Sequence, residues 1–356
     1  MSSVERAQAI NTLQSLRGRP LIAYATSPRQ GLPTAVAPDI LPIFYEHLRR
    51  LAKHAGALDV FIMTFGGDTT VPLPLQYLMR EYADEISALV PAECYSAGTM
   101  IALGANEIVM TPLGHLSPVD PSVAHPLNPQ SPVLLPGGTP GVPQVLQIAV
   151  EQVFSYLSLA TEKANLDDQD ALTKVFERLA ESVHPIALGE IHRSHSLIRV
   201  LVDKLLRLHL DDQERIRAIV EALTEKLFNH SYKISRREAR DDLNLPVVTP
   251  SNDIERAMMD LRDVYVADAK MFEPFDLAAE LARAVPVPVP TAGLRTGGAA
   301  PTTPTGGTVR LSFEAGFVDS SAGDTAFVFR YEAAPSGNAA APYNFRQTSK
   351  WESTWN

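Results

Sequence analysis

Short apolar runs alternate with helix-like segments over residues 1–111, and this alternation limits the fold more than any other feature of the sequence. The apolar runs have the length and composition of buried strands, and they lie at 20–25, 58–65, 86–94 and 107–110. Amphipathic or small-residue segments typical of helices lie between them, at 40–54, 70–84 and 97–105. Strands that alternate with helices form parallel βαβ units, so the sequence predicts an α/β fold with a parallel sheet.

The composition excludes several classes of protein. The 356 residues include 45% hydrophobic and 20% charged side chains, which is ordinary for a globular protein with a sizeable core. The formal net charge of -10 argues against a protein that binds a nucleic-acid backbone or an anionic membrane surface. The single cysteine, Cys94, excludes a disulfide framework and a multi-cysteine metal site. We therefore expect no metal ion, no other cofactor and no nucleic-acid partner.

Hydropathy along the chain gives an expectation about location. No uninterrupted apolar run approaches the roughly 18 residues of a membrane span. The first ten residues carry charges and lack the apolar segment of a secretory signal. We expect a cytoplasmic protein without a membrane span.

Proline content marks the end of the first region. Residues 112–143 contain nine prolines, which exclude a helix and predict a long loop. Residues 144–283 are mostly helical in pattern, and expected helices cover 145–163, 187–209 and 213–228. Asp211 or Asp212 is expected to cap the last of these helices.

A second change in composition follows Ala284, where Pro, Gly and Thr become frequent and predict an extended linker. Further on, the segments 309–313 and 326–331 have the composition of paired strands and predict a β-hairpin. The expected organisation is a main domain at 1–283, a linker at 284–308, and a small β-rich or extended element at 309–356.

Two short segments hold the residues best suited to catalysis. In the first, a predicted strand ends at the pair Gly66-Gly67. In the second, Ser96 lies at a turn from a strand into a small-residue helix. A serine at such a turn presents its hydroxyl outward, and backbone N–H groups at a helix start stabilise negative charge. This combination suits acyl transfer, in which a hydroxyl attacks a carbonyl and N–H donors hold the oxyanion.

Each segment also has a purely structural interpretation. A Gly-Gly pair after a strand is usually only a turn, and a serine before Ala-Gly is usually a helix cap. The order of the two segments, their separation of about thirty residues and the small-residue helix after Ser96 favour the catalytic interpretation.

Three stretches of the sequence together resemble the ClpP/crotonase superfamily. They are 61–67 (FIMTFGG), 95–110 (YSAGTMIALGANEIVM) and 116–121 (LSPVDP). Two later stretches, 229–239 (NHSYKISRREA) and 243–247 (LNLPV), resemble the serine dehydrogenase proteinase family, which is similar to signal peptide peptidase A. The resemblance covers roughly residues 15–250. It implies a ClpP/crotonase-like repeated ββα core with helical additions, while the Pro/Gly-rich C-terminal tail lies outside it.

The resemblance implies roles for three residues. Ser96 would be the nucleophile, and the N–H groups of Gly67 and Ala97 would form the oxyanion hole. The chain departs from the family pattern at Phe65, where a small residue or proline is usual, and at Ala97, where glycine is usual. Both departures leave the backbone donors in place.

The resemblance leaves the general base open. The histidine and aspartate positions of the Clp proteolytic subunit fall here near Val119 and Leu227, which do not titrate. His230 is the favoured base, because imidazole titrates near neutral pH and the segment is similar to the family's His-x-Tyr pattern. Asp120 is expected to orient it, and Lys163 is the alternative base. The competing interpretations are that His230 only caps the preceding helix and that Asp120 is only a turn residue.

Three functions remain open at this point. The first is a serine peptidase that cleaves peptides or unfolded proteins through an acyl-enzyme on Ser96. The second is a scaffold or binding module of the same fold without turnover. The third is a crotonase-type acyl-CoA enzyme, which uses the same two donors for a thioester. The resemblance also implies a homo-oligomer that encloses its serines, with helices at 145–228 as the expected contacts.

Overall fold

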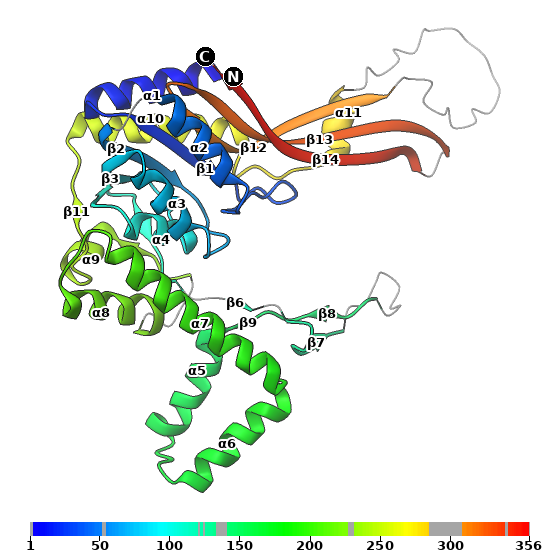
Figure 1. Cartoon of the computed structure of the whole chain (residues 1–356). Coiled ribbons are helices and arrows are strands. Elements are labelled where there is room, and N and C mark those ends of the chain that lie inside the picture. The colour runs from blue at the N-terminus through cyan, green and yellow to red at the C-terminus, as the bar shows by residue number, and fades with distance from the viewer. Residues whose placement is uncertain are drawn as a thin grey trace.

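The computed structural model describes residues 3–51, 55–119, 122–123, 125–132, 141–226, 231–284, 308–338 and 341–355. Its centre is a mixed sheet of eight strands in the order β11-β4-β3-β2-β1-β12-β13-β14, flanked by helices (Figure 1). The predicted α/β class and the parallel sheet of the first region are confirmed.

Five strands of the sheet run parallel. They are β1 (Leu21–Thr26), β2 (Ala55–Met63), β3 (Ala83–Val90), β4 (Glu107–Met110) and β11 (Val247–Val248). Along β1, Leu21 and Ala23 face one hydrophobic core, whereas Ile22 and Tyr24 face the other. A parallel sheet that is covered on both faces needs apolar residues at successive positions, and this explains the continuous apolar runs of the sequence.

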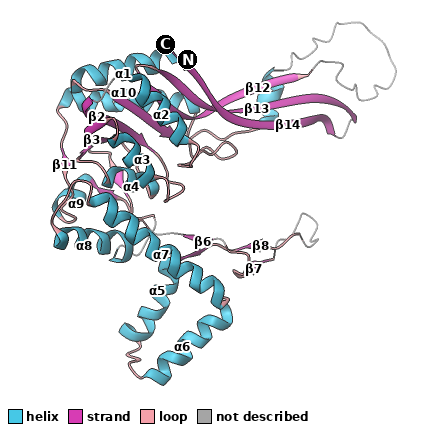
Figure 2. Ribbon diagram, viewed as in Figure 1, coloured by secondary structure: helices cyan, strands magenta, loops and turns pink. Residues whose placement is uncertain are grey.

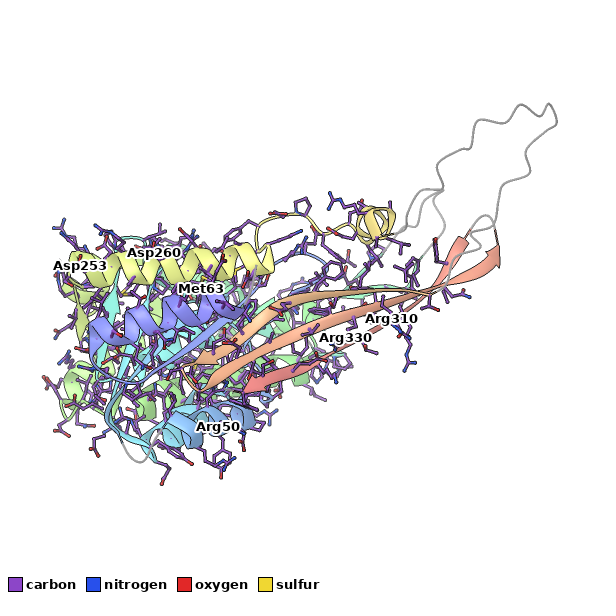
Figure 3. All side chains as sticks on the ribbon, turned by 90° about the horizontal axis from the view of Figure 1, so that it is seen from above. Arg50, Met63, Asp253, Asp260, Arg310 and Arg330 are labelled. Atoms are coloured by element: carbon purple, nitrogen blue, oxygen red, sulfur yellow. The ribbon has the colours of Figure 1, made fainter. Side chains whose placement is uncertain are left out.

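Helices cover both faces of this sheet (Figure 2). One face carries α1 (Ser3–Arg17) and α10 (Asn252–Ala269), which lie side by side in the view from above (Figure 3). The other face carries α2 (Ile40–Leu51), α3 (Pro72–Arg80) and α4 (Ala97–Leu103). Apolar stripes such as Ile40, Phe44 and Leu48 of α2 are fully or almost fully buried against the strands.

The C-terminal strands extend the same sheet. They are β12 (Val309–Ser320), β13 (Gly323–Asn338) and β14 (Ala341–Trp355), all antiparallel. The predicted hairpin is confirmed by the pair Phe313 and Phe329, and β12 joins β1 through pairs such as Tyr24 with Val318. These strands therefore do not form a sheet of their own, and their outer parts, with Arg310 and Arg330, reach beyond α1 and α10 (Figure 3).

The remaining elements form a helical region and short ribbons. The helices are α5 (Val150–Ser158), η1 (Leu159–Lys163), α6 (Gln169–Ser182), α7 (Pro185–Leu206), α8 (Gln213–Glu221), η2 (Ala222–Lys226), α9 (Arg236–Asp241) and α11 (Leu277–Ala284). The ribbons pair β5 (His115–Leu116) with β10 (Ile234–Ser235), β6 (Ser122–Val123) with β9 (Ile148–Ala149), and β7 (Gln130–Ser131) with β8 (Gln144–Val145).

Two expectations about the helical region have different outcomes. Asp212 caps α8, because its Oδ1 accepts from the N–H groups of Glu214 and Arg215, so that prediction is confirmed. The predicted helix at 145–163 is wrong at its start, since the chain there forms β8 and β9 before α5 begins at Val150. In the part of the chain that the structure describes, no helix has the length and apolarity needed to cross a membrane.

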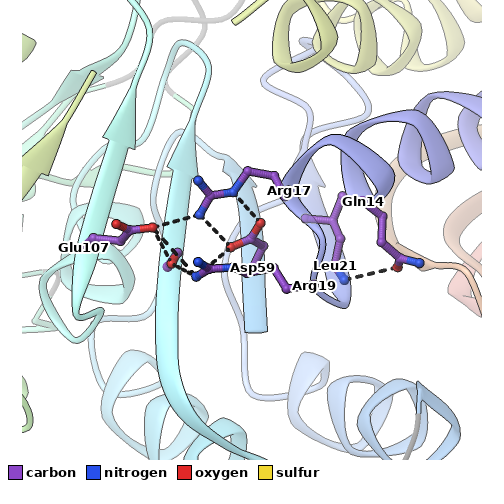
Figure 4. A network of polar contacts seen from close by, with 7 residues as sticks. Gln14, Arg17, Arg19, Leu21, Asp59 and Glu107 are labelled. Atoms are coloured by element: carbon purple, nitrogen blue, oxygen red, sulfur yellow. Dashed lines mark hydrogen bonds and ion pairs between the residues drawn. The ribbon is translucent and has the colours of Figure 1, made fainter. Parts of the chain in front are cut away.

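A polar network fixes the ends of the strands where the chain enters the sheet (Figure 4). Asp59, Ser87 and Glu107 are neighbours in register on β2, β3 and β4. Arg17 at the end of α1 contacts Asp59 and Glu107, each at 2.7 Å. Burial raises the pKa of Asp59, and Arg17 opposes that shift by stabilising the carboxylate. The network holds α1 against the sheet, and it does not involve the carboxyl ends of the strands.

His47 links α2 to the C-terminal strands from a fully buried position. Its Nδ1 lies 2.8 Å from the Ser320 hydroxyl, and its Nε2 lies 3.1 Å from the Thr325 hydroxyl. Burial lowers the pKa of His47 from 6.5 to about 4, because the interior disfavours the charged imidazolium. The folded state therefore holds a neutral ring in a range of pH where the unfolded chain binds a proton.

This shift predicts a loss of stability in acid. The contribution of His47 is fully present above its ordinary pKa of 6.5 and is lost as the pH falls toward about 4. The expected loss is up to about 3 kcal/mol in the free energy of unfolding. Urea denaturation at a series of pH values tests it, with His47→Gln as the comparison, because glutamine does not titrate. Equal pH slopes for the two proteins would contradict the prediction.

Candidate active site

The two segments singled out in the sequence meet at the carboxyl ends of β2 and β3. Thr64 and Cys94 form a parallel bridge beyond the strand ends, in which the Thr64 N–H donates to the Glu93 carbonyl at 2.9 Å. The Tyr95 N–H donates back to the Thr64 carbonyl at 3.0 Å. The two backbones then separate at Gly66 and Ser96, which places the turns beside each other where ligands bind in sheets of this type.

Ser96 has an unusual backbone conformation directly before α4, with φ of 51° and ψ of -112°. Positive φ is uncommon outside glycine and costs about 1–3 kcal/mol when the surrounding structure imposes it. The Ser96 side chain makes no capping hydrogen bond to α4, so the helix-cap interpretation is wrong. Its hydroxyl has no hydrogen-bond partner among the described residues, although Ser96 is only 7% exposed. The structure thus holds a strained serine whose hydroxyl is not used for packing or capping.

Two neighbouring hydroxyls hold this conformation. The Ser96 N–H donates to the Ser117 hydroxyl at 2.7 Å, and that hydroxyl donates to the Pro118 carbonyl at 2.9 Å. The Ser117 N–H donates to the Thr99 hydroxyl at 3.0 Å, and Thr99 donates to the Cys94 carbonyl at 2.8 Å. Ser117 and Thr99 are buried and position the turn, a role that the sequence analysis missed.

The glycine pair lies against Ser96. Gly66 has φ of +106°, and a Cβ at this position would lie 3.0 Å from the Ser96 Cβ and 3.5 Å from its Oγ. Gly67 has φ of +147° and packs against the backbone of Val36. The Val36 N–H donates to the Gly66 carbonyl, and the Asp68 N–H donates to the Val36 carbonyl, both at 2.8 Å. These two bonds leave the N–H of Gly67 itself unused.

Two backbone donors accompany the hydroxyl. Ala97 is the first residue of α4, where N–H groups have no partner inside the helix. Within the described ranges, neither the Gly67 N–H nor the Ala97 N–H donates a hydrogen bond. In an acyl-transfer reaction a free hydroxyl can attack the carbonyl, and free N–H groups can hold the oxyanion that forms. The structure therefore brings Ser96, Gly67 and Ala97 into one small region.

The predicted base and its partner, His230 and Asp120, lie outside the described residues. The described residues around them approach the site. The Val119 N–H donates to the Leu223 carbonyl at 2.9 Å, and Ile234 pairs with Leu116 in the ribbon of β10 and β5. Both contacts lie next to Ser117, the residue that accepts from the Ser96 N–H.

Lys163, the alternative base, is the exposed last residue of η1. This turn connects α5 to α6, and both helices extend away from the sheet and from α4 (Figure 1). The structure does not bring Lys163 together with Ser96.

Comparison with known proteins shows a similarity to a distant relative. A segment of 202 residues is 24% identical to an uncharacterized protein of Methanocaldococcus jannaschii. The match covers 55% of this chain and 57% of the archaeal protein, so the chain spans little more than half the length of that relative. No family model matches the chain, and no solved structure matches it. A functional proposal therefore depends on the geometry around Ser96.

Proposed function

We propose that the protein is a serine peptidase that hydrolyses peptide bonds through an acyl-enzyme on Ser96. One observation carries the proposal: the strained Ser96 presents an unbonded hydroxyl beside the Gly66-Gly67 turn. Strained backbone is concentrated at functional sites, because it is retained only where the surrounding structure imposes it. Peptide or unfolded protein is the proposed substrate, and membership of the ClpP/crotonase superfamily, in its serine dehydrogenase proteinase branch, belongs to the same proposal.

The proposed reaction combines the groups around Ser96 with the base and its partner that the sequence analysis favours. The Ser96 Oγ attacks the peptide carbonyl, and the N–H groups of Gly67 and Ala97 receive the developing oxyanion. His230, oriented by Asp120, takes the Ser96 proton and delivers it to the leaving amine. In the second step the same base takes a proton from water, which attacks the acyl-enzyme. This step restores Ser96 and releases the second product.

Assembly into a homo-oligomer in the cytoplasm is also part of the proposal. The helix α6 carries Leu172, Val175, Phe176 and Leu179 at helical spacing, yet none of its residues is buried. An amphipathic helix gains most of its stability from burying its apolar side. A second copy of the chain could cover this side of α6. This agrees with the expectation that helices at 145–228 form the contacts between subunits.

Fluorophosphonate labelling of the full chain tests the proposed function. We expect a single covalent adduct on Ser96 in intact-mass and peptide-mass measurements, and its loss in Ser96→Ala. Ser96→Ala should also lower the hydrolysis of unstructured peptides by at least about a thousandfold. Ser155→Ala on α5 is the matched control and should label like the wild type.

Two outcomes would overturn the peptidase. If the folded wild-type protein is neither labelled nor able to hydrolyse peptides, the non-catalytic binding module becomes the favoured function. Binding of coenzyme A thioesters in calorimetry, without labelling at Ser96, would instead favour the acyl-CoA enzyme.

A further inference from the structure

Three aromatic rings form a continuous group next to the candidate nucleophile. Phe65 directly precedes Gly66, and Tyr95 directly precedes Ser96. The Phe65 and Tyr95 rings have centroids 5.9 Å apart and meet edge to face at 84°. Phe272 also contacts Phe65, with ring centroids 6.4 Å apart and an interplanar angle of 74°. We call these three residues the aromatic group.

The outer ring of the group is held by a well-anchored turn. Lys270 ends α10 with φ of 48°, and the next residue, Met271, is only 2% exposed. The Glu273 N–H donates to the Lys270 carbonyl at 3.0 Å, and Arg29 donates to the Glu273 carbonyl at 3.1 Å. These contacts hold the backbone of the turn on both sides of Phe272.

The aromatic group keeps much of its apolar surface in contact with solvent. Phe272 is 58% exposed, while Phe65 and Tyr95 are partly buried. An exposed cluster of large apolar side chains beside reactive groups is typical of a ligand-binding surface. Aromatic rings in edge-to-face contact accept a further ring or a long aliphatic side chain with favourable geometry.

We infer that Phe65, Tyr95 and Phe272 form a subsite that binds an aromatic or long aliphatic side chain of the substrate, next to the bond that Ser96 attacks. The inference rests on the proposed function, because it assigns a preference to the same site. The two inner rings belong to the residues directly before the glycine turn and the serine, so a peptide that reaches Ser96 also reaches them. Phe65 stands where the resembling family usually has a small residue or proline, and the subsite is therefore a property of this chain.

The surroundings disfavour an acidic side chain in this subsite. Burial raises the pKa of Tyr95 to about 12, and the neighbouring Glu93 carboxylate contributes to the shift. A negatively charged substrate side chain would be repelled by Glu93 and would lose its hydration against the rings. The expected order of preference is phenylalanine, then alanine, then glutamate.

Binding to the full-length Ser96→Ala protein tests the subsite without turnover. The probes are hexapeptides that differ only at one central position, which is Phe, Ala or Glu, and calorimetry measures their affinities. We expect the Phe peptide to bind about tenfold more tightly than the Ala peptide. Adding Phe272→Ala should remove most of this difference, whereas Phe272→Tyr should retain it. Phe345→Ala is the matched control, because Phe345 is 53% exposed on β14, the edge strand of the sheet.

Hydrolysis by the wild type separates the subsite from the proposed function. If Ser96 labels and cleaves but the three peptides react and bind alike, the subsite is wrong and the peptidase stands. If Phe272→Ala and Phe345→Ala change the Phe preference equally, the subsite is also wrong. If the Phe preference in binding persists while labelling and cleavage fail, the subsite stands and the peptidase is wrong.

Discussion

Replacing Gly67 by alanine is expected to lower the free energy of unfolding by about 3 kcal/mol or more, from backbone strain and overpacking together. A Cβ at this position would overlap the carbonyl oxygen of Val36 and lie 2.5 Å from its nitrogen. Both are backbone atoms, so no side chain can rotate to make room. The φ of +147° adds strain for any residue with a Cβ. Alanine keeps the backbone N–H, but the overlap with Val36 must displace the turn. If the Gly67 N–H holds the oxyanion, this displacement should also lower activity by about 10²–10³-fold.

Gly18→Ala separates the overlap from the cost of the backbone conformation. Gly18 also has positive φ, at +67°, but a Cβ there would meet nothing within 4 Å. We expect Gly18→Ala to lower the free energy of unfolding by only about 1–2 kcal/mol and to retain full activity. Urea denaturation and peptide hydrolysis on both variants provide the measurement. Equal stability and equal activity of the two variants would contradict the predicted role of Gly67.

Replacing Arg6 by methionine is expected to lower the free energy of unfolding by about 3–5 kcal/mol, because it leaves buried carboxylates without their cation. Arg6 on α1 is 3% exposed and contacts Asp268 at 2.7 Å and Asp319 at 3.1 Å. Asp268 is 5% exposed and Asp319 is fully buried. Burial raises the pKa of Asp319 to about 7, and Arg6 opposes the rise. Without Arg6 the loss in the free energy of unfolding should be largest above pH 7, where the Asp319 carboxyl is charged.

Arg178→Met is the matched control for this prediction. Arg178 pairs with Glu181 at 3.0 Å on the surface of α6, where its side chain is 76% exposed. An exposed pair of this kind contributes about 0–1 kcal/mol. Denaturation of both variants at pH 8 and pH 5.5 gives the comparison. A loss for Arg6→Met as small as that for Arg178→Met would show that the buried carboxylates tolerate the missing cation.

The parts of the fold that follow local patterns could be predicted from the sequence. Apolar runs separated by amphipathic segments predict parallel strands, and the carboxyl ends of neighbouring parallel strands lie together. For this reason the sequence places the Gly66-Gly67 turn beside Ser96, and the structure has them in contact. The wrong start of the 145–163 helix has a local cause as well, since two-residue ribbons have too short a pattern to detect.

The features that depend on distant contacts could not be predicted. The pairing of β12 with β1 joins segments almost 300 residues apart, and no local signal selects one strand edge over another. In the sequence Arg6 is only one of the charges in the first ten residues, whereas in the structure three carboxylates from distant elements surround it. Ser117 is one hydroxyl among many in a proline-rich stretch, and only the fold shows that it accepts from Ser96.

The ion pair between Arg6 and Glu314 has a consequence for how the chain is made. Glu314 follows Arg6 by 308 residues in the sequence. The first helix therefore leaves the ribosome long before the strand whose carboxylate pairs with Arg6. Contacts of such long sequence separation form late in folding. During synthesis, the edge of β1 that later pairs with β12 therefore has no partner strand until translation passes residue 320, and its backbone N–H and C=O groups stay exposed until then.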